Sequence, residues 1–185
     1  MYVPTKFQIT DRDELFRFID EHAFGQIIST CDGAPFASHI PFLLNHAQTH
    51  LVGHVAKQNP QWREVSGQEV LIIFLGEHAY VSPSWYASSG VPTWNYQAVH
   101  VYGRCQAFTD SEQLAALVGA LTEKHESGFE APWQPDYRLQ MLNAVVGLEI
   151  EITAIQGKYK LSQNRPPQDR QQVAKQSESS GFDSR

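Results

Sequence analysis

The stretch GHVAKQNPQW (residues 53–62) joins a strand-like pattern to the start of a helix. Residues 49–55 alternate as a strand does, Asn59 is a favoured N-cap residue, and Pro60 takes the first helical position, where its missing N–H costs nothing. The free backbone amides of such a helix start, with Lys57 beside them, suit a phosphate group. An ordinary capped helix next to a solvated lysine explains the same residues, so the spacing alone leaves both interpretations open.

Composition and charge favour one globular, cytoplasmic domain. The chain of 185 residues is long enough to bury a sizeable core, and no apolar run approaches the ~18 residues of a membrane span. The two cysteines form no CxxC pair, so neither a disulfide framework nor a zinc knuckle is indicated. The net charge is −6, from 14 Lys and Arg against 20 Asp and Glu. This acidic charge argues against DNA as a partner, because contacts with DNA phosphates require a basic surface.

The order of the predicted elements indicates a mainly β fold with peripheral helices. Asp32 and Gly33 form a strong hairpin signal, and the run VLIIFL (residues 70–75) is typical of a strand buried on both faces. Pro35 and Pro41 indicate that the second hairpin strand lies at an edge for part of its length. Strands are predicted over residues 25–31, 34–45, 51–55, 70–75, 79–82, 94–108 and 146–154, and helices over 11–22, 60–66, 111–125 and 135–143. This pattern favours a Greek-key-like antiparallel β-barrel with a few flanking helices.

Two further signals concern element ends and the C-terminal part of the chain. We expect a kink at Gly103 in the long strand, and a capping box of Thr109 and Glu112 before the helix that follows it. After residue 165 the sequence becomes strongly polar. We therefore divide the chain into a folded domain, residues 1–165, and a disordered polar tail, residues 166–185.

Five short strings resemble the signatures of one known family. They are ASHIPF (37–42), HVAKQNPQW (54–62), SPSWY (82–86), PTWNY (92–96) and KLSQN (160–164). In this order they resemble the PaiB-like family of FMN-binding negative transcriptional regulators, which share the FMN-binding split barrel of the pyridoxamine phosphate oxidases. The resemblance implies FMN as the cofactor, and a homodimer with the cofactor at the subunit interface.

The same resemblance implies which residues contact the cofactor. The phosphate would lie at the strand-to-helix junction, where the oxidases carry Ser-Arg-Lys and this chain has Val-Ala-Lys, so two polar ligands are missing. The residues implied at this junction are His54, Val55, Lys57 and Asn59. Those implied beside the flavin ring are Ser38, His39 and Ile40 from one chain, and Trp94, Asn95 and Gln97 from the other. Lys160 and Ser162 would line the wall of the site.

Several of these residues also have an ordinary structural explanation. Ser38 and His39 suit the surface of an edge strand, and Trp94 suits a core or an interface. His50 and His54 lie at positions i and i+4 on one strand face, and this spacing suggests a metal or haem site as an alternative. No H-x-E-x-x-H string or Cys/His ligand set accompanies them, so we expect no metal.

Two functions stay open at this point. The first is transcriptional control or flavin-dependent sensing by a PaiB-like, FMN-binding split barrel. The second is a flavin-dependent oxidoreductase without direct DNA binding, which the acidic composition favours. The sequence assigns no catalytic residue to either.

Overall fold

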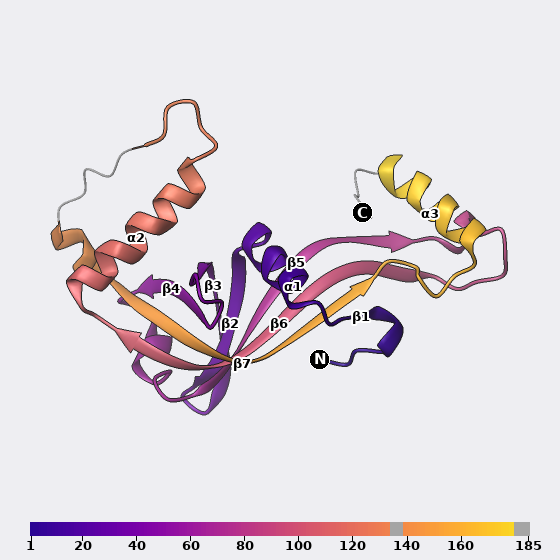
Figure 1. Ribbon diagram of the computed structural model, residues 1–185. Coiled ribbons are helices and arrows are strands. Elements are labelled where there is room, and N and C mark those ends of the chain that lie inside the picture. The colour runs from indigo at the N-terminus through magenta and orange to yellow at the C-terminus, as the bar shows by residue number, and fades with distance from the viewer. Residues whose placement is uncertain (134–138, 180–185) are drawn as a thin grey trace.

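Seven strands form one antiparallel sheet that closes on itself (Figure 1). A computed structural model describes residues 1–133 and 139–179. The strand order is β1-β7-β4-β3-β2-β5-β6, and β6 also pairs with β7, so that strands β2 to β7 close a barrel. The strands are β1 (Gln8–Ile9), β2 (Phe24–Cys31), β3 (Ala34–Leu44), β4 (His50–Ala56), β5 (Glu69–Val81), β6 (Thr93–Phe108) and β7 (Val145–Lys160).

Three α-helices flank the sheet, one short 3-10 helix precedes β1, and three others lie between later strands. The α-helices are α1 (Arg12–Glu21), α2 (Ser111–Glu126) and α3 (Pro167–Ser179). The 3-10 helices are η1 (Thr5–Phe7), η2 (Pro60–Arg63), η3 (Pro83–Trp85) and η4 (Leu139–Ala144). Across the described ranges 1–133 and 139–179, none of the helices combines the length and apolar character needed to cross a bilayer.

Local sequence signals account for the first half of the barrel. Asp32 and Gly33 both have positive φ, 51° and 73°, and they join β2 to β3 with Cys31 opposite Ala34. This is the predicted two-residue hairpin turn, because a tight turn of that kind needs left-handed residues. Over residues 34–41, β3 pairs only with β2, as the two prolines in that strand predict.

The core fills the barrel and extends under α1. Phe42 and Phe74 meet edge-on inside it, with ring centroids 5.7 Å apart. The α1 side chains Leu15, Phe16, Phe18 and Ile19 are all buried against the same core. Asp11 caps α1 by accepting hydrogen bonds from the amides of Asp13 and Glu14, which confirms the helix predicted over residues 11–22.

Three long strands continue beyond the barrel as an arm. The last pair between β2 and β5 is Gln26 with Ile73, whereas β5 goes on pairing with β6 as far as Val81. A register shift between Leu75 and His78 marks where the arm begins, so the two strands predicted over 70–75 and 79–82 are one bulged strand. Figure 1 shows β5, β6 and β7 reaching away from the barrel together, with α3 lying over their far end.

Several predicted element ends are wrong. The helix expected over residues 60–66 is only the four-residue η2, and α2 is capped by Asp110 rather than Thr109. The strand predicted to end at residue 154 continues to Lys160. The helix predicted over 135–143 lies partly outside the described residues, and its described part is η4.

The predicted disordered tail is also wrong for residues 167–179, which form α3. Asp169, Val173 and Ser177 are almost completely buried on one side of that helix. The low apolar content led to the wrong prediction, because α3 docks mainly through polar contacts, which hydrophobic patterning does not reveal. The division at residue 165 is therefore not a boundary between order and disorder.

We predict that Gly103→Ala destabilises the barrel by about 1–3 kcal/mol, because a Cβ at this position would lie 2.5 Å from the carbonyl oxygen of Glu151. This oxygen belongs to the neighbouring strand at the register shift of β6 and cannot rotate away. The matched control is Gly119→Ala in α2, where a Cβ meets nothing within 4 Å. The free energy of unfolding of this control should rise by roughly 0.5–1 kcal/mol, because alanine favours a helix more than glycine does. Denaturant unfolding of both variants measures this, and an undisturbed Gly103→Ala protein would contradict the close approach.

Candidate functional site

The strand-to-helix junction after β4 is held by a polar network. Asn59 accepts a hydrogen bond from the amide of Gln61 at 2.9 Å, which confirms it as an N-cap. Its side-chain nitrogen donates to the Ser38 hydroxyl at 2.7 Å. Ser38 and Asn59, both predicted as cofactor contacts, therefore bind each other and fasten η2 to β3.

Gln61 completes this network and is a residue that the sequence reasoning missed. Its side chain is fully buried, and its nitrogen lies 2.9 Å from the Ser29 hydroxyl and 3.3 Å from the carbonyl oxygens of Ile27 and Phe36. Gln61 thus ties η2 to the inner faces of β2 and β3. Nothing in the local sequence separates a buried glutamine from an exposed one at this position, since η2 is too short to show periodicity.

A phosphate cradle built on helix amides does not form at this junction. η2 has four residues, so few aligned peptide dipoles exist, and the Gln61 amide is already bound by Asn59. The Lys57 backbone is fixed by two hydrogen bonds of 2.8 Å, with Ala144 and with the Trp62 indole. The Lys57 side chain is exposed, and its ammonium makes no hydrogen bond or ion pair with residues 1–133 or 139–179. Lys57 is therefore a group at the junction that could bind an anion.

The remaining residues predicted on this side divide into core and surface. Ile40 and Val55 are core residues, so only their backbones could contact a ligand. His39 is exposed and stacks on Phe24 with ring centroids 6.5 Å apart. His54 is half-buried, and burial lowers its pKa. We call Ser38, His39, Ile40, His54, Val55, Lys57 and Asn59 the Lys57 cluster.

The other predicted residues gather at the arm. Trp94 is 52% exposed and lies edge-on to Tyr80, with centroids 6.1 Å apart. Asn95 is buried and accepts a 3.1 Å hydrogen bond from the hydroxyl of Ser162, a left-handed residue with φ 66°. The side-chain nitrogen of Asn95 is buried and has no partner among the described residues. Asn95 thus joins β6 to the turn after β7.

Lys160 and Gln97 differ in how freely they can reach a ligand. The Lys160 ammonium donates at 2.5 Å to both the Thr93 hydroxyl and the Trp94 carbonyl oxygen. Burial, and then the charge of Lys158, lower the pKa of Lys160. Gln97 lines a cavity of about 340 Å³ between α1 and the arm, where its neighbours include Tyr159. We call Trp94, Asn95, Gln97, Lys160 and Ser162 the Trp94 cluster.

The lysines of the two clusters lie at opposite ends of β7. Lys57 donates its amide to Ala144, the residue before β7 begins, whereas Lys160 is the last residue of the strand. The sixteen residues of β7 span about 50 Å of extended chain. Figure 1 likewise shows β4 on the far side of the barrel from the end of the arm. One flavin mononucleotide therefore cannot touch both Lys57 and Lys160 of the same chain.

The histidines form no metal cluster within the described ranges. The imidazole of His50 lies 2.9 Å from the Thr49 hydroxyl. Among the described residues, the three side chains of metal-ligand type that lie close together are those of Cys31, Asp32 and Glu64. Glu64 accepts hydrogen bonds from the Asp32 amide at 3.2 and 3.4 Å, which explains its position as a cap on the hairpin turn.

Comparison with known proteins agrees with this fold. A family model described as "Putative FMN-binding domain" matches residues 1–154. The chain is 40% identical over 184 residues to "Protease synthase and sporulation protein PAI 2" of Bacillus subtilis, covering 95% of this chain and 88% of the relative. It is also 32% identical, over 80% of its length and 76% of the relative's, to an uncharacterised protein of Emericella nidulans.

Solved structures share the fold at low sequence identity. The flavocytochrome Anf3 of Azotobacter vinelandii superimposes with a TM-score of 0.69 at 14% identity, over 83% of this chain and 69% of that one. The FAD- and haem-binding protein of Mycobacterium smegmatis superimposes with a TM-score of 0.67 at 21% identity, over 83% of this chain and 73% of that one. These likenesses confirm the predicted split-barrel fold. With the family match over residues 1–154, they lead to one conclusion: this chain belongs to the PaiB-like family of FMN-binding split-barrel proteins.

Proposed function

We propose that the chain forms a homodimer in which each FMN lies between the Lys57 cluster of one subunit and the Trp94 cluster of its partner. The observation that carries this proposal is the separation of the two clusters along β7. A single chain offers an anion-binding lysine at one end and an exposed tryptophan at the other. Two chains related by a twofold axis would place the Lys57 end of each chain beside the Trp94 end of its partner, and so form two equivalent sites.

An apolar surface beside His39 supports the same dimer. Phe24 is 66% exposed and Leu75 is 50% exposed. Each lies two residues beyond the pair of Gln26 and Ile73, on the same outward face of β2 and β5. His39 stacks on this Phe24 ring and is paired with Gln26 across β2 and β3. Contiguous exposed apolar surface of this kind is typical of protein interfaces. A second copy covering it would therefore border the Lys57 cluster directly.

The residues present fit FMN when both clusters contribute. The exposed Lys57 ammonium suits the phosphate, since it supplies a charge-assisted hydrogen bond. Trp94 offers an exposed aromatic face for the flavin ring, and the partly exposed Gln97 offers an amide donor for its edge. Bound FMN would supply hydride- and electron-transfer chemistry. The role of the chain's own residues is to bind and orient it and to exclude water.

The biological role of this dimer follows from its relatives and its charge. We propose flavin-dependent control of transcription in the cytoplasm, as the PaiB-like family implies. The net charge of −6 argues against an extended contact with DNA, so the control would act through a partner. A flavin-dependent oxidoreductase is the second candidate, and the acidic composition is the observation that favours it.

Lys57→Ala should weaken FMN binding by about 10- to 100-fold, because it removes one charge-assisted contact with the phosphate. Riboflavin, which lacks the phosphate, should be affected far less. Stability without cofactor should change by less than about 0.5 kcal/mol, because the side chain is exposed. Titration of flavin fluorescence measures both affinities, with the exposed Lys175→Ala as control. Equal FMN affinity in Lys57→Ala and the parent would place the phosphate elsewhere.

A mixed dimer tests whether the site is shared between chains. Lys57→Ala and Trp94→Ala homodimers should each bind FMN weakly. After subunit exchange in equal amounts, half of the dimers contain one chain of each kind, and each of these has one intact site. About a quarter of all sites should therefore regain the affinity of the parent. No recovery, with exchange verified by mass, would show that Lys57 and Trp94 act in the same chain.

Direct DNA binding and redox turnover separate the two candidate functions. We expect gel-shift titrations over a salt series to show no complex with a steep salt dependence, because a basic footprint is lacking. A complex whose log K falls with log salt at a slope of about −5 or steeper would contradict partner-mediated control. Oxidation of a reduced nicotinamide by the FMN-loaded dimer at an enzyme-like rate of ~1 s⁻¹ or more would establish the oxidoreductase instead.

A further inference from the structure

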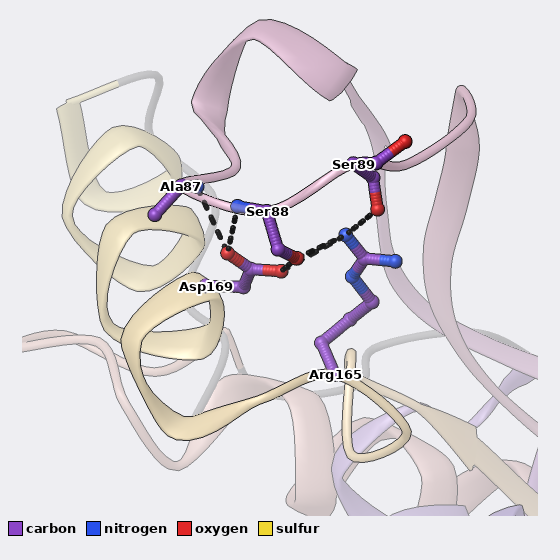
Figure 2. A network of polar contacts seen from close by, with 5 residues as sticks. All are labelled: Ala87, Ser88, Ser89, Arg165 and Asp169. Atoms are coloured by element: carbon purple, nitrogen blue, oxygen red, sulfur yellow. Dashed lines mark hydrogen bonds and ion pairs between the residues drawn. The ribbon is translucent and has the colours of Figure 1, made fainter.

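The loop that leads into the Trp94 cluster is held by a buried carboxylate of α3. Figure 2 shows Asp169 pointing from the first turn of α3 at the loop of residues 86–89. One carboxylate oxygen accepts from the amides of Ala87 and Ser88 at 2.9 and 3.1 Å, and the other accepts from the Ser88 hydroxyl at 2.6 Å. Asp169 is only 1% exposed. The carboxylate thus does for the loop amides what an N-cap residue does for a helix start.

Arg165 holds the same loop from its other side. Its guanidinium pairs with Asp169 at 2.9 Å and donates to the carbonyl oxygen of Ser89 at 3.0 Å and the hydroxyl of Ser88 at 3.2 Å. It also lies over the Tyr86 ring, 3.9 Å from the centroid. The Ser88 hydrogen bond holds the pKa of Asp169 below its ordinary value, so the Asp169 carboxylate is ionised near neutral pH. Asp169 and Arg165 together form a clamp on residues 86–89.

The clamp is linked to the Trp94 cluster at both of its ends. Residues 86–92 run directly into Thr93 and Trp94, where β6 begins. On the other side, the Arg165 amide donates to the carbonyl oxygen of Ser162 at 2.9 Å, and Ser162 in turn binds Asn95. Movement of α3 would therefore move the strand start that carries Trp94 and the turn that carries Ser162.

Polar contacts dominate the docking of α3, which favours positioning over simple stabilisation. Among residues 167–177 of α3, the buried side chains are Val173, which is apolar, and Asp169 and Ser177, which are polar. Such a surface contributes little hydrophobic free energy, whereas directed hydrogen bonds fix one orientation. The family match ends at residue 154, so it does not include this helix.

We propose that Asp169 and Arg165 are positioning residues, which hold the loop of residues 86–92 so that Trp94 meets the FMN bound by the partner subunit. This inference rests on the proposed dimer site. Without the clamp, the loop and Trp94 would have to be ordered when FMN binds, and that ordering would reduce the affinity. Neither residue needs to touch the cofactor.

Asp169→Asn tests the clamp, because it keeps the side-chain size and one acceptor oxygen but removes the ion pair. The matched control is Arg170→Ala, an exposed neighbour on the same helix. In the cofactor-free dimer, hydrogen exchange at the amides of Ala87 and Ser88 should accelerate in Asp169→Asn and stay unchanged in the control. FMN affinity should fall roughly 10-fold, and the visible circular dichroism of the bound flavin should change as the Trp94 environment changes. Should Asp169→Asn fail to fold, Ser88→Ala weakens the clamp from the loop side, and the same results are expected.

The outcomes separate this inference from the proposed function. Faster exchange at Ala87 and Ser88 with parental FMN affinity and an unchanged flavin spectrum would overturn it, because the helix would then only fasten the loop. Unchanged exchange would overturn it as well, since the clamp would not hold those amides. If the parent itself bound no FMN, the proposed function would fail and this inference with it. If the parent bound FMN and Asp169→Asn bound it equally well, only this inference would fail.

Discussion

The backbone ladder of β7 is the constraint on which the rest of this structure depends. β7 pairs with β4 and β6 along the barrel and with β6 and β1 further on, so a single strand both closes the barrel and forms part of the arm. Its length fixes Lys57 and Lys160 at opposite ends of the molecule. Strand hydrogen bonds of this kind are cooperative and cannot be shifted by one residue without turning every side chain to the other face. The separation of the two clusters is therefore built into the register rather than into a flexible linker.

The barrel and the arm use different physical means to hold their shape. The barrel rests on a continuous apolar core, in which residues such as Phe42, Phe74 and Ile150 are almost completely buried. The far end of the arm lies outside this core. There, side-chain hydrogen bonds join the strands and the loops. Lys160 binds the start of β6, Ser162 binds Asn95, and Asp169 binds the loop before Trp94. Directed hydrogen bonds of this kind fix the relative orientation of the segments that they join.

The sequence predicted the parts of the fold that local chemistry determines. The turn at Asp32 and Gly33 and the helix capped by Asp11 follow from backbone rules that act within a few residues. The site could be predicted only in outline. The family strings proposed the segments of the candidate site, but they could not show that Ser38 and Asn59 bind each other or that Asn95 is buried. These facts depend on contacts between segments distant in sequence. α3 was missed for a related reason, although Pro167 and Asp169 stand where a helix start favours proline and an acidic residue.

The central claim is that one FMN needs two chains, and sedimentation of the FMN-loaded protein tests it most directly. Sedimentation velocity recorded at a flavin wavelength and at a protein wavelength reports which species carries the cofactor. The account predicts that all bound flavin sediments with a species of twice the 20.9 kDa mass of one chain, with one flavin per chain, and that dilution to monomers releases the flavin. Flavin that stays bound to a sedimenting monomer would contradict the shared site.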